Sequence, residues 1–169
     1  MPRVFFVHQW MMTLCEIYIR MKILKRIIWI IILLVTLATC GLLYLRYCDW
    51  NPEKAAEYVT KNAEKKSVGW CAKYVRKAIM AGGIPLYQGG DAWSYKYLLP
   101  LLGFKEIEDV NDKKVGDIVV FQPIGKRYFG HIAMWNGRQW ISDFKQRSII
   151  VHSDYRKDSC EYTILRKGE

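Results

Sequence analysis

The sequence contains no CxxC pair and no cluster of histidine and cysteine residues with the spacing of zinc ligands. No metal or other cofactor is therefore expected. No basic run is interleaved with aromatic residues, the pattern typical of nucleic-acid stacking surfaces, so no nucleic-acid partner is expected. Internal repeats and low-complexity segments are also missing. The length of 169 residues then allows one ordinary domain plus an appendage.

Charged residues are missing from one long stretch, residues 27–45, which reads IIWIIILLVTLATCGLLYL. A helix over that stretch would be roughly 28 Å long at about 1.5 Å per residue, close to the hydrocarbon thickness of a bilayer. The remaining domain is too small to surround such a helix, which argues against a buried core helix. We therefore expect a transmembrane anchor over residues 27–46 and a short cytoplasmic segment over residues 1–26.

The charges that flank this stretch predict its orientation. Four cations lie within residues 20–26, whereas the charges that follow the stretch nearly cancel. Cytoplasmic flanks of membrane helices carry the excess of Lys and Arg. We therefore expect a single-pass protein of the inner membrane, with its C-terminal domain on the periplasmic side. Residues 51–169 hold 20 Lys and Arg against 14 Asp and Glu, so +6 of the formal net charge of +10, which would let that domain face an anionic cell wall or lipid headgroups.

The N-terminal region leaves alternatives open. Translation could start at Met21, because MKILKR before an apolar run looks like a signal sequence. Residues 37–40, LATC, also have a faint lipobox character, although threonine is unusual directly before the cysteine. We favour an uncleaved anchor. In an oxidising compartment, Cys48 and Cys160 could form a disulfide.

Residues 50–169 are predicted to form one α+β domain, in which N-terminal helices pack on an antiparallel β-sheet. Asn51 and Pro52 suit the cap and the first position of a helix, and Gly82 suits the end of the next helix. The expected helices cover residues 52–64, 71–82 and 91–102. The expected strands cover residues 117–121, 130–135, 139–144, 149–152 and 161–165.

Cys71 stands where the second of these helices begins. A helix N-terminus carries roughly half a positive charge, which stabilises a thiolate over a thiol. The alternative is a buried and inert cysteine that packs as a small apolar residue. The charge pattern of the helix alone does not decide between the two.

A nucleophilic cysteine needs a base and a group that orients the base. His131 opens a predicted strand, whereas His152 lies near a strand end and is the weaker candidate. If a three-residue loop joins the strands around Asn136, then Asp143 lies opposite His131 with Cβ atoms about 5 Å apart. A two-residue loop would instead turn Asp143 to the other face of the sheet. We predict the three-residue loop.

Three segments resemble CHAP amidases of the papain-like NlpC/P60 superfamily. Residues 67–75, SVGWCAKYV, resemble the nucleophile segment of that family. Residues 115–121, VGDIVVF, and residues 130–133, GHIA, are similar to two of its strands, and residues 91–93, DAW, to an element between them. The segments follow in the family order, and the resemblance covers residues 67–151.

The resemblance implies that Cys71 attacks an amide of peptidoglycan, with His131 as the base and Asp143 at the third position. A thioester would form and water would resolve it, with no metal required. The sequence departs from the family at Trp70, because many CHAP domains have glutamine before the cysteine. The backbone N–H of Cys71 is therefore our first candidate for an oxyanion donor. Residues expected to line the substrate groove are Trp70, Trp93, Gln122 and Tyr128.

The predicted function is that of a membrane-tethered peptidoglycan hydrolase, either an N-acetylmuramoyl-L-alanine amidase or a peptide endopeptidase. A catalytically silent wall-binding or scaffold protein is one alternative. A toxin-like antibacterial effector or a phage-derived lysis protein with the same chemistry is another, and an inhibitor or immunity protein would then be a partner. An acyltransferase on the same fold is the last alternative.

Overall fold

The computed structural model describes residues 3–46, 49–87, 89–151, 154–157 and 160–168. The chain divides into two compact units, Met1–Leu43 and Tyr44–Glu169. Most of the first unit is one helix, α1 (Arg3–Arg46), which begins well before the expected anchor. His152 and Cys48 lie outside the described residues, so the expected disulfide of Cys48 with Cys160 lies outside them as well.

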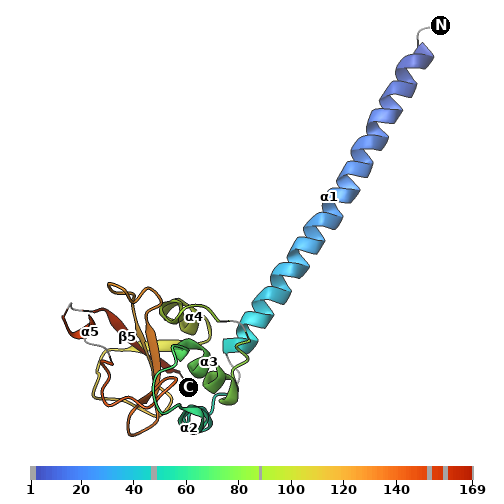
Figure 1. Ribbon diagram of the computed structural model, residues 1–169. Coiled ribbons are helices and arrows are strands. Elements are labelled where there is room, and N and C mark those ends of the chain that lie inside the picture. The colour runs from blue at the N-terminus through green and yellow to red at the C-terminus, as the bar shows by residue number, and fades with distance from the viewer. Residues whose placement is uncertain (1–2, 47–48, 88, 152–153, 158–159, 169) are drawn as a thin grey trace. The chain divides into compact units, whose positions relative to one another are not determined.

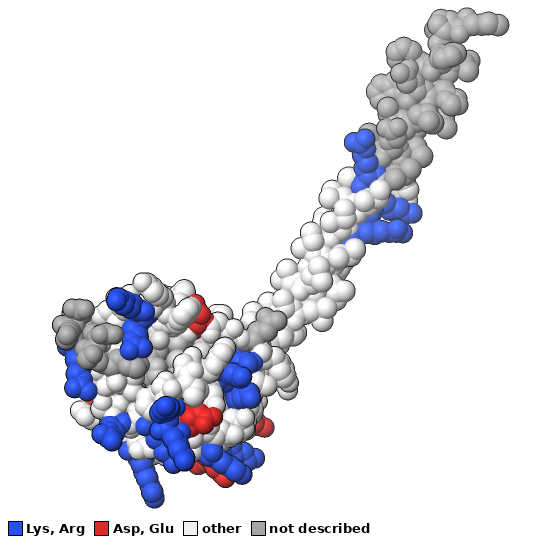
Figure 2. All heavy atoms as spheres, viewed as in Figure 1, with Lys and Arg blue, Asp and Glu red and all other residues white. Residues whose placement is uncertain are grey.

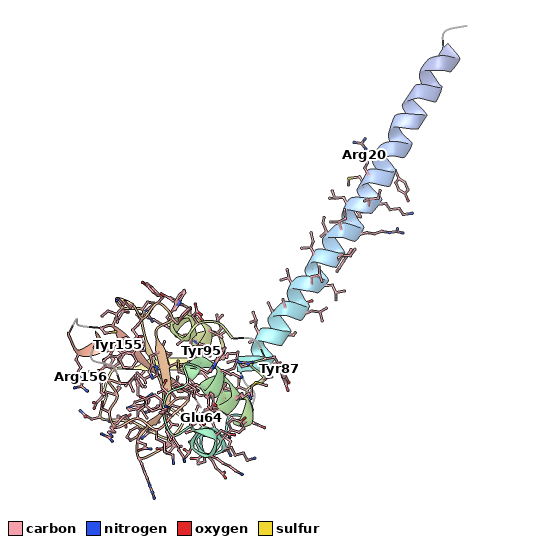
Figure 3. All side chains as sticks on the ribbon, in the orientation of Figure 1. Arg20, Glu64, Tyr87, Tyr95, Tyr155 and Arg156 are labelled. Carbon is pink, nitrogen blue, oxygen red and sulfur yellow. The ribbon has the colours of Figure 1, made fainter. Side chains whose placement is uncertain are left out.

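Helix α1 contains a stretch, Arg20–Tyr44, that is long and apolar enough to cross a membrane. Its 25 residues have a mean hydropathy of 2.6, and none of its apolar window is buried within the structure. Figure 2 shows basic side chains at the start of this stretch and an uncharged surface along it, and Figure 3 shows its side chains protruding around the helix. A signal sequence near the N-terminus has the same properties. Membrane insertion therefore stays a prediction.

The second unit is an α+β domain, as expected, with helices packed on an antiparallel sheet (Figure 1). Its helices are α2 (Pro52–Asn62), α3 (Cys71–Ala81), the 3-10 helix η1 (Ala92–Ser94), α4 (Tyr95–Leu101) and the short α5 (Asp154–Lys157). Its strands are β1 (Phe104–Ile107), β2 (Ile118–Phe121), β3 (His131–Trp135), β4 (Trp140–Ile141) and β5 (Tyr162–Lys167). The sheet order is β1-β5-β2-β3-β4, and every neighbouring pair is antiparallel.

The start of α2 follows the predicted capping chemistry. The Asn51 side chain accepts a hydrogen bond from the Lys54 backbone N–H at 2.7 Å, and Pro52 occupies the first turn, where its missing N–H costs nothing. The Asn51 backbone N–H donates to the carbonyl of Gly82 at 2.8 Å, which joins the start of α2 to the end of α3. A Cβ at position 82 would collide with the Trp50 ring, so the close approach of α2 and α3 at this point requires a glycine.

The two faces of the sheet bury separate apolar clusters. Alternate residues of β2 and β3 point to opposite faces, because the side-chain period of a strand is two residues. Ile118, Val120 and Ile132 pack with α2, α3 and α4 in the larger cluster, which also holds Tyr95. The opposite face carries the smaller cluster around Tyr155, and Figure 3 labels both tyrosines. The larger cluster fixes α3, and therefore Cys71, against β3.

Three strand predictions differ from the structure. Strand β1 was not expected, because its Lys105 and Glu106 are exposed on the sheet edge and weaken the apolar pattern. The expected strand 139–144 is only two residues long, since the chain turns back after Ile141 and bridges to Lys145. Residues 149–151 form no strand, and β5 lies between β1 and β2.

A buried ion pair ties the start of β2 to β5. The Asp117 carboxylate is fully buried and accepts two hydrogen bonds from the Arg166 guanidinium, each 2.8 Å long. It also accepts the Lys114 backbone N–H at 2.8 Å, which shapes the turn before β2. Asp117 therefore has a structural role at the start of β2. Arg166 additionally contacts Asp112, and these two carboxylates raise its pKa above the usual value for arginine.

We expect Arg166→Met to lower the free energy of unfolding by about 3–5 kcal/mol, because it leaves the Asp117 carboxylate buried without its cation. Denaturant unfolding of the purified chain measures this loss. The matched control is Arg156→Met, since Arg156 is exposed and should tolerate the change within about 0.5 kcal/mol. A loss below about 1 kcal/mol for Arg166→Met would contradict the assignment.

Candidate active site

Cys71 is the first residue of α3 and is partly buried against the larger core cluster. Gly69 has a φ of 80°, which lets the chain turn sharply into the helix. The Trp70 carbonyl accepts the first helical hydrogen bond from the Tyr74 N–H at 3.1 Å. The thiol therefore lies at the end of α3 where backbone N–H groups have no partner within the helix.

The pKa of the Cys71 thiol is raised, which is the opposite of the direction expected from a helix N-terminus alone. Burial is the largest cause, and the nearby Asp143 carboxylate adds to it. Hydrogen bonds from the backbone N–H groups of Ile132, Ala72 and Cys71 lower the pKa but do not outweigh burial. In the free protein Cys71 is therefore a thiol at neutral pH and needs a base to become a nucleophile.

Asp143 anchors the loop that precedes Cys71. Its Oδ2 accepts the backbone N–H groups of Val68 at 2.7 Å, Gly69 at 2.8 Å and Trp70 at 3.3 Å. The same oxygen accepts the Ser67 hydroxyl at 3.1 Å. Burial would raise the pKa of Asp143, but these hydrogen bonds, with one from Ser142, lower it instead. The carboxylate thus holds the loop that leads into α3, whose own N-cap residue makes no side-chain hydrogen bond.

His131 opens β3 and is buried, with only 5% of its surface exposed. The residue after it, Ile132, directs its backbone N–H to the Cys71 thiol. The structure therefore brings the two residues predicted as nucleophile and base to the same end of β3. Gly130 precedes the histidine with a φ of 66°, and a Cβ there would lie 2.3 Å from the Phe121 carbonyl oxygen. This glycine lets β3 begin close against β2.

The expected pairing of His131 with Asp143 is wrong. Trp135 pairs with Trp140, so the loop between β3 and β4 has four residues rather than three. The pairing ends at Ile141, and the next residues form a tight turn in which the Ser142 N–H donates to the Phe144 carbonyl at 3.0 Å. Asp143 lies in that turn and points to the Cys71 loop.

Gln146 occupies the place beside the histidine that Asp143 was expected to fill. Its Nε2 lies 2.7 Å from His131 Nε2, and its side chain is 1% exposed. The same nitrogen donates to the Ser142 hydroxyl oxygen at 3.0 Å. A group in hydrogen-bond contact with a catalytic imidazole orients the ring. Gln146 was not found from the sequence, because it follows an irregular turn that no periodicity predicts.

The four residues expected to line a substrate groove lie in different settings. Trp70 and Tyr128 are exposed, at 60% and 70%, on the loops that lead into Cys71 and His131. Trp93 is partly buried, packs edge-on against Tyr97, and donates its backbone N–H to the Phe129 carbonyl at 3.2 Å. The Trp93 backbone therefore lies beside the segment that leads into His131.

The backbone of Gln122 bonds to the residues that precede β5. Its backbone N–H donates to the Glu161 carbonyl at 3.0 Å, and its own carbonyl accepts the Cys160 thiol at 3.8 Å. Its amide nitrogen is buried without a hydrogen-bond partner among the described residues. A role of Gln122 and of the other three residues in substrate binding stays a prediction.

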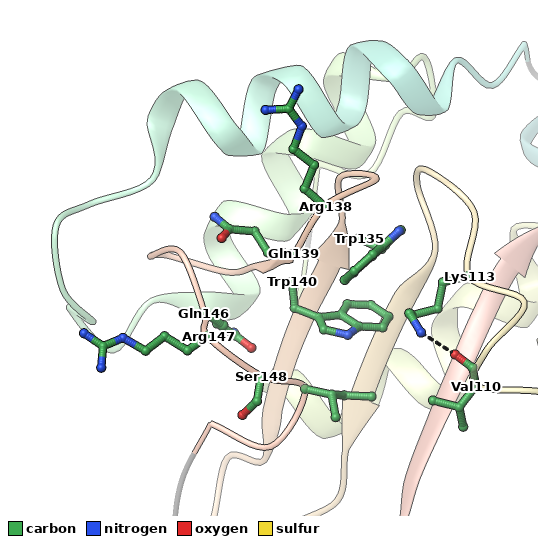
Figure 4. A pocket seen from close by; sticks show the side chains of 10 residues that line it. Val110, Lys113, Trp135, Arg138, Gln139, Trp140, Gln146, Arg147 and Ser148 are labelled. Carbon is green, nitrogen blue, oxygen red and sulfur yellow. Dashed lines mark hydrogen bonds between the residues drawn. The ribbon is translucent and has the colours of Figure 1, made fainter.

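A cavity of about 250 Å³ lies beyond Gln146, on the outer side of β3 and β4. Trp140 and Trp135 form its wall, and Lys113 donates a hydrogen bond to the Val110 carbonyl at its rim (Figure 4). Figure 4 shows that Arg138, although part of the lining, points away from Trp140. Cys71 is not among the lining residues, so this cavity is separate from the thiol.

The raised pKa of Cys71 predicts slow alkylation at neutral pH. In a variant whose other four cysteines are serine, the rate with iodoacetamide should rise along a pH curve whose midpoint lies above that of free cysteine. Free cysteine in the same buffer is the control. A midpoint below that of free cysteine would show that the helix start and the N–H groups outweigh burial.

Comparisons with known proteins give one strong similarity. No family model matches the sequence, and no curated protein matches it. Among solved structures, the chain is similar to the native type VI effector–immunity complex Tae3–Tai3 from Ralstonia pickettii, with 38% sequence identity and a TM-score of 0.66. The match covers 70% of this chain and 100% of that chain. The CHAP resemblance stays a prediction, because no family model supports it.

Two further similarities differ in weight. The selenomethionine form of the same Ralstonia pickettii complex is 40% identical with a TM-score of 0.62, over 66% of this chain and 98% of that chain. NlpC2 from Trichomonas vaginalis is 17% identical with a TM-score of 0.42, over 70% of this chain and 46% of that chain. The similarity to NlpC2 is too low to support an inference.

Proposed function

The chain belongs to the family of the type VI effector Tae3, and on that premise we propose that it hydrolyses an amide bond of peptidoglycan. The bond would be the one between muramic acid and the stem peptide, or one within the peptides. One observation carries this proposal. The cysteine at the start of α3 accepts the backbone N–H of Ile132, the residue directly after the histidine that opens β3, and a buried carboxylate holds the loop that leads into the cysteine.

The reaction begins when His131 takes the proton of the Cys71 thiol, which the raised pKa of that thiol requires. The sulfur then attacks the amide carbonyl, and a tetrahedral oxyanion forms. The backbone N–H of Cys71 is the first candidate to stabilise it, since helix-start amides suit a developing negative charge.

Collapse of this intermediate breaks the C–N bond, and His131 returns the proton to the leaving amine. A thioester between Cys71 and the acyl fragment remains. Water, deprotonated by His131, attacks the thioester; the C–S bond breaks, the acyl fragment leaves as a carboxylic acid that ionises, and His131 returns the proton to the Cys71 sulfur. Asp143 holds the Cys71 loop throughout, and Gln146 orients the imidazole.

An antibacterial effector is the biological role we favour, because Tae3 of Ralstonia pickettii, a member of this family, is the effector of an effector–immunity complex. We therefore expect a cognate immunity protein that binds the catalytic unit. The test is to mix the chain with the protein encoded beside it and to assay hydrolysis. Undiminished hydrolysis with every neighbouring gene product would contradict this expectation.

The apolar stretch Arg20–Tyr44 is proposed to anchor the chain in the inner membrane, with the catalytic unit on the periplasmic side. The supporting observations are its length, its hydropathy and the cations at its N-terminal end. Protease added to spheroplasts should digest the C-terminal unit. Protection of that unit until the membrane is lysed would contradict the orientation.

The proposed activity is tested by incubating the full chain, in detergent, with purified sacculi and analysing soluble fragments by mass spectrometry. Amide hydrolysis should release fragments with a new free amine and a new carboxylate, and their masses identify the bond. Fragments with only new reducing sugar ends would contradict the proposal. No fragments at all would favour the silent wall-binding alternative.

A further inference from the structure

Four buried polar side chains form an unbroken chain of hydrogen bonds between the Cys71 loop and the imidazole. Ser142 donates to Asp143 Oδ1 at 2.9 Å, Gln146 Nε2 lies 3.0 Å from the Ser142 oxygen, and the same nitrogen lies 2.7 Å from His131 Nε2. Asp143 and Ser142 are fully buried, and Gln146 and His131 are 1% and 5% exposed. We infer that Ser142 is a positioning residue. By donating to the Asp143 carboxylate it can only accept from Gln146, and the orientation of the Gln146 amide then fixes which nitrogen of His131 carries the proton.

The direction of each hydrogen bond follows from the first one. The hydrogen bonds to Asp143 hold its pKa below the usual range, so at neutral pH the carboxylate is ionised and can only accept. Ser142 has a single hydroxyl hydrogen and donates it to Asp143. The Ser142 oxygen is then left as an acceptor, and Gln146 must present its NH₂ group rather than its carbonyl oxygen.

The second hydrogen of that NH₂ group points to His131 Nε2. A donor at this position requires an unprotonated Nε2, so neutral His131 carries its proton on Nδ1. In the usual cysteine or serine triad the third group accepts a hydrogen from the imidazole, which is the opposite direction. The Oε1 atom of Gln146 is buried without a hydrogen-bond partner among the described residues. If the amide turned over, Oε1 could accept a hydrogen bond from His131 Nε2.

In this tautomer Nε2 is the ring nitrogen that must take the Cys71 proton, so the Gln146 donor has to leave it first; once protonated, Nε2 is a donor and its partner must be an acceptor. Turning the Gln146 amide would supply Oε1 for that purpose and would break the bond to Ser142. The chain of bonds therefore favours the neutral imidazole in the resting protein. This consequence for catalysis rests on the proposed function, whereas the position of the proton does not.

The test is nitrogen NMR of the full chain in detergent micelles, with ¹⁵N-labelled histidine and the His131 signals assigned by His131→Gln. At a pH where His131 is neutral, Nδ1 should give the shift of a protonated nitrogen and Nε2 that of an unprotonated one. Ser142→Ala should abolish this preference, and Ser142→Thr, which restores a hydroxyl, should regain it. Ser148→Ala is the matched control, because Ser148 is exposed and donates its hydroxyl to the Ile150 carbonyl.

A proton on Nε2 in the wild-type chain would overturn the inference without any variant, as would an unchanged spectrum in Ser142→Ala. Should Ser142→Ala fail to fold, Asp143→Asn replaces it, because an amide can donate to Ser142 and release the constraint. Loss of the preference in that variant supports the inference, and its retention overturns it. The spectra are independent of sacculus hydrolysis, so failure of the proposed function is recognised separately.

Discussion

Replacing Cys71 with alanine is expected to lower the rate of fragment release from sacculi on the order of 10⁴-fold, to the level of the uncatalysed background. The thiol is the only group in the proposed reaction that forms a covalent bond to the substrate, and loss of a nucleophile has effects of this size. The measurement is the rate of soluble fragment release by wild-type and variant chains at equal concentration.

The fold of this variant should survive, which separates a catalytic role from a structural one. Cys71 is only partly buried, and its replacement removes a single sulfur atom. The free energy of unfolding should change by about 1 kcal/mol or less. The matched control is Cys160→Ala, another partly buried cysteine, which should keep full activity. Hydrolysis by Cys71→Ala within a few-fold of wild type would remove Cys71 from the mechanism.

Replacing Asp143 with alanine is expected to lower both stability and activity. It leaves the N–H groups of Val68, Gly69 and Trp70 without their buried acceptor. Hydrogen bonds to a charged group contribute about 1.5–3 kcal/mol each, and their effects overlap, so we expect a loss of about 3–4 kcal/mol. Activity should fall about 100-fold, because a displaced Cys71 loop misplaces the nucleophile.

Two matched variants sharpen this prediction. Asp143→Asn keeps one oxygen acceptor for the loop and should lose less stability than Asp143→Ala. Glu108→Ala removes an exposed carboxylate on another loop and should change neither property. Denaturant unfolding and sacculus hydrolysis measure the two effects. A loss of stability no larger in Asp143→Ala than in Glu108→Ala would contradict the anchoring role.

The lowered pKa of Asp143 also predicts how stability depends on pH. A carboxylate whose pKa is lower in the folded than in the unfolded chain stabilises the fold above the unfolded value, about 3.9. That contribution is lost as the pH falls through the lower, folded value. Wild-type stability should therefore drop more steeply below about pH 4 than that of Asp143→Ala. Parallel curves for the two chains would contradict this linkage.

The regular parts of the fold could be predicted from the sequence, because local chemistry determines them. Asn51 and Pro52 mark the start of α2, and the continuous apolar run of residues 118–121, rich in β-branched residues, marks a strand with two buried faces. Cys71 and His131 could be found for the same reason, since each stands at the boundary of a regular element.

The third side chain of the site could not be predicted, because its position depends on a turn. Adding one residue to a hairpin loop changes every pairing that follows, and the loop after Trp135 has four residues instead of three. The chain then reverses within Ser142–Asp143–Phe144, which brings Gln146 back beside Trp140 and next to His131. The burial that raises the pKa of Cys71 could not be predicted either, because it arises from packing of α3 on strands that are distant in the sequence.

The most direct test of the central claim, that Cys71 is the nucleophile of an amide hydrolase, is to trap the thioester. The full chain is mixed with muropeptides, quenched with acid within milliseconds to seconds, and digested with a protease for mass spectrometry. The account predicts that the peptide containing Cys71 gains the mass of an acyl fragment, that hydroxylamine removes it, and that Cys71→Ala shows none. Fragment release from the wild-type chain with no adduct on Cys71 at any quench time, or with an adduct on another residue, would contradict it.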